Sequence, residues 1–156
     1  MIRRFALIAT LFLTLPGTAN ALSCARPDVA RSFHIANKAS ETYLIVLGEI
    51  EYLGKSLRKS TRPETRKARL RARAITRTGF SAWLDRDITV NITCAGPWCG
   101  SIPQGERLLI FLRQSAAGDV IDAQPCAQFV FTDPGQAEMR TLRSCLSGGH
   151  CEPRYR

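Results

Sequence analysis

The sequence predicts a mainly β protein, a small closed or nearly closed barrel with a helix at each end and with reinforcing disulfide bonds. One long and several shorter segments have the apolar patterning of strands, and helical patterns flank them at both ends. Six cysteines are scattered along the chain after a candidate export signal: Cys24, Cys94, Cys99, Cys126, Cys145 and Cys151. An even number of cysteines in a small exported chain indicates a disulfide framework.

Residues 1–21 have the pattern of a signal peptide. The pattern combines a basic start, an apolar run and a small-residue cleavage site: Arg3 and Arg4, Phe5 to Leu15, and Ala19-Asn20-Ala21. The apolar run is shorter than the roughly 20 residues that span a bilayer, and no other stretch approaches that length. We therefore expect an exported protein, periplasmic or secreted, with no transmembrane segment after signal removal. Residues 22–156 then form a single domain.

A short helix is expected first in the mature chain, with Pro27 in its first turn and an end near 37–40. Its apolar residues recur at helical spacing: Val29, Ala30, Phe33 and Ala36. A long strand is expected from Thr42 to Leu53. Four of its apolar residues share one face: Leu44, Val46, Ile50 and Tyr52. Gly48 lies inside this strand and predicts a bend or bulge, as a barrel needs where a strand turns a corner.

The segment from Lys55 to Arg77 holds the excess positive charge of the chain. It contains ten basic residues and one acid, for a local net charge of +9 that equals the net charge of the whole chain. Read as a helix, it begins with a capping box at 61–64. Read as a strand, it places on one face Arg69, Arg71, Arg73 and Arg77. We favour a loop from about Lys55 to Lys67 followed by a strand, because the chain otherwise lacks a strand between the first and third.

Three further strands are expected in the rest of the chain. Apolar and polar residues alternate from Ile88 to Cys94, which is typical of a half-buried strand. Leu108 to Leu112 is wholly apolar and predicts a buried strand. Val120-Ile121 predicts a strand that pairs with it across a turn near Gly118.

The chain should end with a second helix. Asp133 is the expected N-cap, with Pro134 at the first helical position and Gln136 at the third. This helix should run to about Leu146 and stop at 148–149, where two glycines follow each other.

Four features of the mature chain together have a counterpart in a known family: Cys24 near the start, the strand through Gly48-Glu49-Ile50, the motif Pro-x-Gly-x-x-Leu-Leu-x-Phe-Leu at 103–112, and the late Cys126 and Cys145. They resemble the netrin-like domain, a superfamily that includes the N-terminal domains of tissue inhibitors of metalloproteinases. The pattern Cys-Ala-Gly-Pro-Trp-Cys-Gly at 94–100 is similar to that of short exported bacterial proteins of unassigned function. The resemblance implies a five-stranded barrel of the oligonucleotide/oligosaccharide-binding (OB) type.

The resemblance also implies a possible chemistry, from which this chain departs at one point. In the metalloproteinase inhibitors, the mature chain begins with a cysteine whose free amine and carbonyl grip the zinc of the target. Here Leu22 and Ser23 should precede Cys24, so the nitrogen is acylated and cannot bind the zinc in that way. Metalloprotease inhibition through Cys24 is therefore an alternative function, as is a structural role in the cell envelope.

The leading hypothesis is an exported, non-enzymatic binding module that contacts anionic partners through the basic segment. Alternate strand residues lie about 6.6 Å apart, so a row of arginines could meet successive charges on a polyanion. The candidate anion-binding residues are Arg66, Lys67, Arg69, Arg71, Arg73 and Arg77. The competing interpretation is a solvated face that protects an edge strand from aggregation. Export excludes intracellular nucleic acid, which leaves acidic glycans, anionic lipid head groups or an extracellular protein as partners.

The remaining chemistry-bearing residues predict no catalytic or metal site and no cofactor. His34 and His150 are the only histidines, and no cluster of carboxylates lies near either in the sequence. Trp98-Cys99-Gly100 resembles part of a thioredoxin active site, but no cysteine follows two residues later, so a structural disulfide is expected. Six cysteines allow 15 connectivities. Our working hypothesis pairs Cys24 with Cys126, Cys94 with Cys99, and Cys145 with Cys151.

Overall fold

The computed structural model describes residues 23–54 and 59–154. The predicted signal peptide and part of the predicted loop after the first strand lie outside the described residues. Among the described residues, no helix is both long and apolar enough to cross a membrane.

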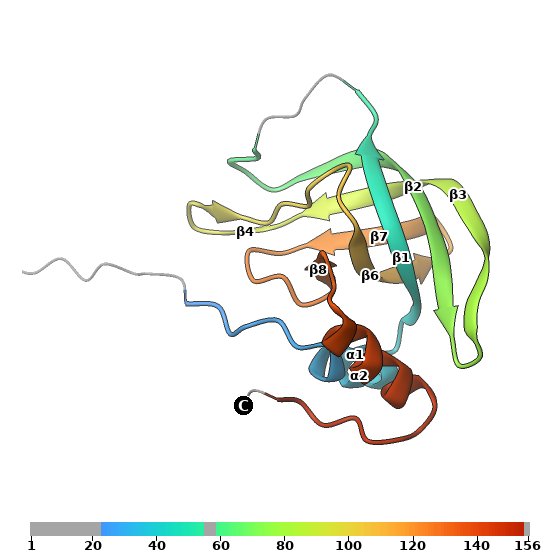
Figure 1. The fold of residues 1–156 in the computed structure, drawn as a ribbon. Coiled ribbons are helices and arrows are strands. Elements are labelled where there is room, and N and C mark those ends of the chain that lie inside the picture. The colour runs from blue at the N-terminus through green and yellow to red at the C-terminus, as the bar shows by residue number, and fades with distance from the viewer. Residues whose placement is uncertain (1–22, 55–58, 155–156) are drawn as a thin grey trace, which may run out of the picture.

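Five strands form a closed barrel of the OB type, as predicted (Figure 1). They are β1 (Thr42–Tyr52), β2 (Glu64–Thr76), β3 (Gly79–Ile92), β6 (Leu108–Ser115) and β7 (Gly118–Ala123). The order around the barrel is β1-β2-β3-β7-β6, and β6 pairs with β1 to close the ring. All neighbouring pairs are antiparallel except β3 and β7, which run parallel.

Three short strands that the sequence patterns did not predict lie outside the ring of the barrel. Strand β8 (Val130–Thr132) pairs with β6 outside the ring. Strands β4 (Cys94–Ala95) and β5 (Trp98–Cys99) form a small hairpin between β3 and β6. Each has only two or three residues, which is too short for a periodic pattern to be recognised.

The bend predicted at Gly48 is where β1 changes partners. Residues 42–48 of β1 pair with β6, and residues 46–52 pair with β2. A Cβ atom on Gly48 would lie 2.1 Å from the Arg71 carbonyl oxygen and 2.4 Å from the Ala72 Cα atom. Only glycine therefore allows β2 to approach β1 this closely at the corner of the barrel.

The later part of the basic segment is a strand, as favoured, but β2 begins at Glu64, a few residues earlier than expected. Its partner β3 is also longer than the predicted strand at Ile88–Cys94, because it begins at Gly79. The charged residues at 85–87 conceal the first half of β3 in the sequence. They are compatible with a strand because Asp85 and Asp87 pair with an arginine across the sheet.

Two apolar clusters form the core. The first fills the barrel with inward residues of every barrel strand, among them Val46, Leu70, Val90, Leu112 and Ile121. The second lies between the barrel and the two helices, and it includes Val29, Ile45, Phe111, Phe131 and Leu142. The two helices lie side by side against this outer face of the barrel (Figure 1).

Both helices exist where predicted, but both predicted starts were wrong. Helix α1 (Val29–Lys38) has Asp28 as its N-cap, and the Asp28 carboxylate accepts a hydrogen bond from the Arg31 amide, so Pro27 precedes the helix. Helix α2 (Gln136–Leu146) is capped by Gly135 and not by Asp133. Asp133 instead has a φ of 45° and turns the chain between β8 and α2, so the helix cannot begin there.

The three disulfide pairs of the working hypothesis are confirmed. Cys24–Cys126 joins the start of the described chain to the segment between β7 and β8. Cys94–Cys99 crosses the β4–β5 hairpin, and Cys145–Cys151 closes the chain back onto α2. The described cysteines are therefore all paired, and Cys99 is structural.

Candidate functional site

The structure divides the six predicted anion-binding residues among three environments. Four of them lie on β2 with their side chains outward: Lys67, Arg69, Arg71 and Arg73. Arg66 shares its side of the strand with the buried residues Ala68 and Leu70, so it points toward one end of the barrel. Arg77 lies in the turn after β2, where its Nε atom donates to the Leu146 carbonyl oxygen at 3.3 Å. The six residues therefore do not form one surface.

The middle of the basic segment is neutralised by neighbouring carboxylates. Arg69 bonds Asp85 at 2.6 Å and Asp87 at 2.9 Å, and Arg71 lies 3.3 Å from Glu51. The hydrogen bonds to Asp85 and Asp87 raise the pKa of Arg69. These side chains are exposed, so the ion pairs add little stability, but they cancel much of the positive potential that the sequence suggested.

The end of the basic segment has a different environment. The Arg73 guanidinium lies over the Phe80 ring, 5.3 Å from its centroid, and Nε donates to the Ser81 carbonyl oxygen at 3.4 Å. Phe80 is 41 % exposed and forms one side of a groove of about 590 Å³ beside helix α2. We call it the arginine groove, because Arg107, Arg140 and Arg143 line it together with Phe80, Met139 and 133–136.

The fold brings the three groove arginines together from separate parts of the chain. Arg140 and Arg143 follow Gln136 at i+4 and i+7, so these residues lie on one face of α2. Arg107 precedes β6, and its carbonyl oxygen accepts a 2.8 Å hydrogen bond from the Asp133 amide just before α2. The Arg140 guanidinium donates to the Gln136 side chain at 3.4 Å.

The groove arginines keep their charge available to solvent. Within the described part of the chain, none of the three forms an ion pair, although Asp133 also lines the groove. All three side chains belong to exposed residues. The groove thus combines three cations, one acid and an exposed aromatic ring, which suits an anionic ligand.

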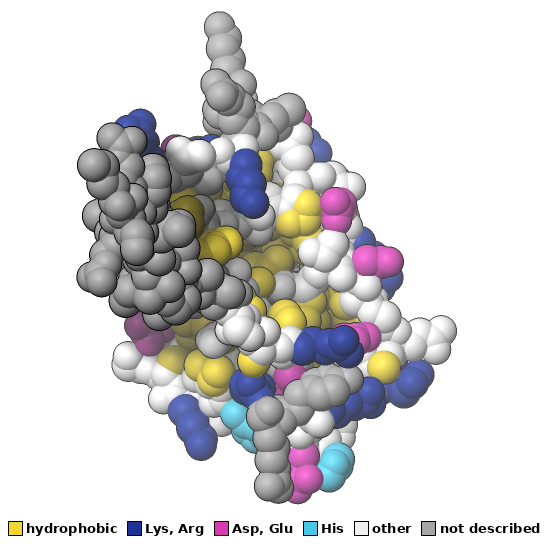
Figure 2. All heavy atoms as spheres, turned by 90° about the vertical axis from the view of Figure 1, so that its left-hand side faces the viewer, with side chains coloured by type: hydrophobic (Ala, Val, Ile, Leu, Met, Phe, Trp, Pro, Cys, Tyr) yellow, Lys and Arg dark blue, Asp and Glu magenta, His cyan; other side chains and the backbone are white. Residues whose placement is uncertain are grey.

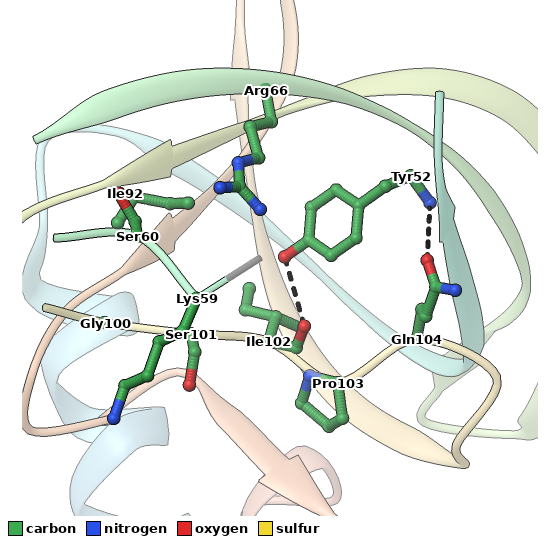
Figure 3. Close-up of a pocket in the computed structure, with 10 residues that line it drawn as sticks. All are labelled: Tyr52, Lys59, Ser60, Arg66, Ile92, Gly100, Ser101, Ile102, Pro103 and Gln104. Carbon is green, nitrogen blue, oxygen red and sulfur yellow. Dashed lines mark hydrogen bonds between the residues drawn. The ribbon is translucent and has the colours of Figure 1, made fainter. Parts of the chain in front are cut away.

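A second cavity, which we call the barrel-end pocket, has a volume of about 400 Å³. Figure 3 shows the ten residues that line it: Tyr52, Lys59, Ser60, Arg66, Ile92, Gly100, Ser101, Ile102, Pro103 and Gln104. They come from the end of β1, the loop before β2, the strands β2 and β3, and the segment before β6. Viewed from the left-hand side of Figure 1, the molecule is hollowed, and hydrophobic side chains gather in the hollow (Figure 2).

The wall at 100–104 is fixed against the barrel. A Cβ atom on Gly100 would lie 2.1 Å from the Ala123 carbonyl oxygen, so only glycine fits there. The Tyr52 hydroxyl donates to the Ile102 carbonyl oxygen at 3.1 Å, and the Gly105 amide donates to the Ile50 carbonyl oxygen at 3.1 Å. Burial raises the pKa of Tyr52, although nearby Arg66 acts in the opposite direction.

Arg66 is held in place at this pocket from two sides. Its guanidinium lies over the Tyr52 ring, 5.6 Å from the centroid, and its Nε atom donates to the Glu64 carboxylate at 2.8 Å. A hydrogen bond to Ser60 lowers the pKa of Glu64, and the contact with Arg66 lowers it further. The cation at the pocket is therefore positioned before any ligand arrives.

The other candidate residues have structural surroundings. The Nε2 atom of His34 is 2.6 Å from the Cys151 carbonyl oxygen, and His150 is exposed. In the described ranges, no group of three or more His, Cys, Asp or Glu residues could hold a metal ion.

Sequence reasoning missed the groove arginines and the pocket residues outside the basic segment. The spacing of Gln136, Arg140 and Arg143 was a detectable signal for one basic helix face, but the contribution of Arg107 depends on the tertiary fold. Comparisons with family models, with curated proteins and with solved structures found no match to this chain.

Proposed function

We propose that this protein is an exported, non-enzymatic binding module for an anionic partner. The contact surface is the arginine groove together with Arg73 at the end of the basic segment. The position differs from the one that the sequence suggested, because the middle of the segment has carboxylate partners, whereas the groove arginines have none among residues 23–54 and 59–154. The partner is an acidic glycan, an anionic lipid head group or an acidic protein surface.

The single observation that supports this proposal is the gathering of Arg107, Arg140 and Arg143 without a described ion pair. Guanidinium groups bind sulfate, phosphate and carboxylate groups through paired N–H donors. The neighbouring Phe80 offers an apolar face against which a sugar ring or an acyl segment can lie. An extended anion seated in the groove would then reach Arg73 beyond Phe80.

The proposal also includes a family assignment and a cellular location. The closed five-stranded barrel and the Cys24–Cys126 disulfide support the proposed netrin-like assignment. Three disulfides support export to an oxidising compartment, periplasmic or extracellular. Neither the family assignment nor the export depends on the arginine groove.

The test is the salt dependence of binding to heparin, a sulfated glycan. The variant R140Q/R143Q removes two groove cations, and K38Q/R154Q removes two exposed cations that lie elsewhere. Because each arginine that contacts a polyanion releases counterions, the slope of log affinity against log salt should fall by about two in R140Q/R143Q. The slope should hardly change in K38Q/R154Q.

The two variants have the same net charge, so nonspecific attraction falls equally in both. Equal slopes for the two variants would show that the groove is not the contact surface. Circular dichroism and urea unfolding check that both variants keep the parent fold, which is expected because all four residues are exposed.

A further inference from the structure

Two exposed aromatic side chains lie on β3 next to the arginine groove. Phe80, which lines the groove, is 41 % exposed, and Trp83 is 62 % exposed. Trp83 lies directly opposite Arg73 in the pairing of β3 with β2, and the Arg73 guanidinium lies over the Phe80 ring. The end of this hairpin lies on the same side of the molecule as helix α2 (Figure 1), where Arg77 donates to the Leu146 carbonyl oxygen. Aromatic rings and arginines therefore alternate from Trp83 to the groove.

This alternation has a counterpart in the chemistry of acidic glycans. Exposed apolar surface that is rimmed by polar groups marks an interaction site on many proteins. An aromatic ring offers a flat apolar face, and the C–H groups of a sugar ring can pack on such a face. A glycan that carries sulfate or carboxylate groups presents flat rings and anions along one chain. The order Trp83, Arg73, Phe80 and groove arginines matches a ligand of this kind.

The arginine groove also offers an acceptor for hydroxyl groups. Asp133 is exposed and lines the groove together with the three arginines. A carboxylate repels a ligand that carries only anionic groups, but it accepts hydrogen bonds from sugar hydroxyls. An acidic glycan therefore suits both the arginines and Asp133, whereas a polyphosphate chain suits the arginines alone.

We propose that the arginine groove, Phe80 and Trp83 bind a linear acidic glycan. Its sugar rings lie on the two aromatic side chains, and its sulfate or carboxylate groups meet the groove arginines and Arg73. The planar guanidinium groups pair with the oxygens of such anions. This inference rests on the proposed anion-binding function and names the class of its partner.

The same observations disfavour an anionic bilayer as the partner. Segments that lie on a bilayer surface separate an apolar side from a charged side, whereas Arg73 lies between two aromatic residues. Trp83 also shares the outer face of β3 with Asp85 and Asp87, because alternate strand residues point to the same side. A planar anionic surface laid on Trp83 would meet these exposed acids, but a narrow glycan chain can pass beside them.

The first test compares three polyanions in binding to the parent protein: a heparin octasaccharide, inorganic polyphosphate and polyglutamate, matched in total charge. Only the octasaccharide has sugar rings. We expect it to bind about tenfold more tightly than the other two, because ring contacts add to the ionic attraction. Equal or tighter binding of polyphosphate or polyglutamate would overturn the glycan assignment. Phosphatidylserine vesicles that bind more tightly than the octasaccharide would assign the surface to lipid and overturn it as well.

A variant pair then locates the ring contacts. F80L/W83L removes both flat rings but no charge. Its affinity for the octasaccharide should fall about tenfold, while the slope of log affinity against log salt and the affinity for polyphosphate stay as in the parent. W98L is the matched control, because it removes another exposed aromatic ring, on the β4–β5 hairpin, and should bind the octasaccharide as the parent does.

The two proposals fail in different ways. A salt slope that R140Q/R143Q leaves unchanged would remove the arginine groove as an anion site, and this inference with it. A slope that falls in R140Q/R143Q, together with unchanged octasaccharide affinity in F80L/W83L, would keep the anion site and reject the glycan. Circular dichroism checks that F80L/W83L keeps the parent fold, and the comparison of the three polyanions on the parent protein depends on no variant.

Discussion

Arg66 shows how much one residue position matters in a strand. It was expected to act with Lys67, Arg69 and Arg71, yet side chains alternate between the two faces of a sheet. Arg66 therefore lies on the side of the buried Ala68, at the barrel end, while its neighbours face solvent. The sequence analysis placed Arg66 in the loop from about Lys55 to Lys67, so the alternation of strand residues was not applied to it. Because β2 begins at Glu64, the alternation includes Arg66.

Asp122 on β7 illustrates a second effect at the residue scale. Burial would raise the pKa of Asp122, but hydrogen bonds from Arg113 and Asn91 outweigh it and leave the pKa below its ordinary value. Arg113 contacts both carboxylate oxygens, at 2.7 and 3.0 Å. The ionised form of Asp122 therefore stabilises the folded state.

The substitution Asp122→Asn should lower the free energy of unfolding at pH 7 by about 2 kcal/mol, because it leaves Arg113 without its charged partner. A lowered pKa gives stability that is present above the unfolded-state pKa, about 3.9, and is lost as the pH falls through the folded-state value. The difference between parent and variant should thus shrink from pH 5 toward pH 2.

Urea unfolding at several pH values measures this difference. Asp133→Asn is the matched control, since Asp133 is exposed and forms no ion pair among the described residues. A constant difference between parent and Asp122→Asn from pH 7 to pH 2 would mean that the ion pair does not contribute in this way.

At the element scale, the pairing of β2 with β3 explains why the basic segment is less positive in the structure than its own sequence indicates. Arg69 lies opposite Asp87 and Arg71 lies opposite Asp85, so acids on β3 face arginines on β2. The acids are visible in the sequence, but their effect depends on the register between two strands. Register is set by the turn and by the buried faces, and sequence patterns alone did not predict it.

The corner of β1 was, in contrast, predictable from Gly48 alone. We expect Gly48→Ala to lower the free energy of unfolding by about 3 kcal/mol, because the new methyl group would collide with the backbone of β2. Gly105→Ala is the control: it strains a positive φ of 68° but meets no atom within 4 Å, so its cost should be about 1 kcal/mol.

Urea unfolding of both glycine variants separates collision from strain. If Gly48→Ala were no more destabilised than Gly105→Ala, β1 and β2 could separate at the corner, and the barrel would be less constrained than the structure indicates.

At the scale of the whole molecule, the sequence predicted the barrel, both helices and a disulfide framework, whereas the three pairings were a working hypothesis that the structure confirmed. Long apolar segments such as Leu108–Leu112 have enough residues for a clear pattern, and β6 formed where this pattern lay. The predicted start of α2 was wrong because Asp133 and Gly135 both suit an N-cap. Asp133 takes part in the turn after β8, so Gly135 is the N-cap.

The candidate sites were predicted less well than the fold. Both cavities join residues distant in the sequence, as Arg107 joins Arg143 and Tyr52 joins Ile102. Local charge density pointed to the middle of β2, where the structure places Arg69 next to Asp85 and Asp87, and Arg71 next to Glu51. Three arginines without an ion pair among the described residues lie instead together beside α2.

The most direct test of the proposed anion-binding surface is an NMR titration of the arginine Nε–Hε resonances with a sulfated heparin disaccharide. The proposal predicts that the resonances of Arg107, Arg140 and Arg143 shift in a saturable way, while those of Arg69 and Arg71 remain in place. Saturable shifts at Arg69 and Arg71 without shifts at the groove arginines would contradict it and return the contact surface to the middle of the basic strand.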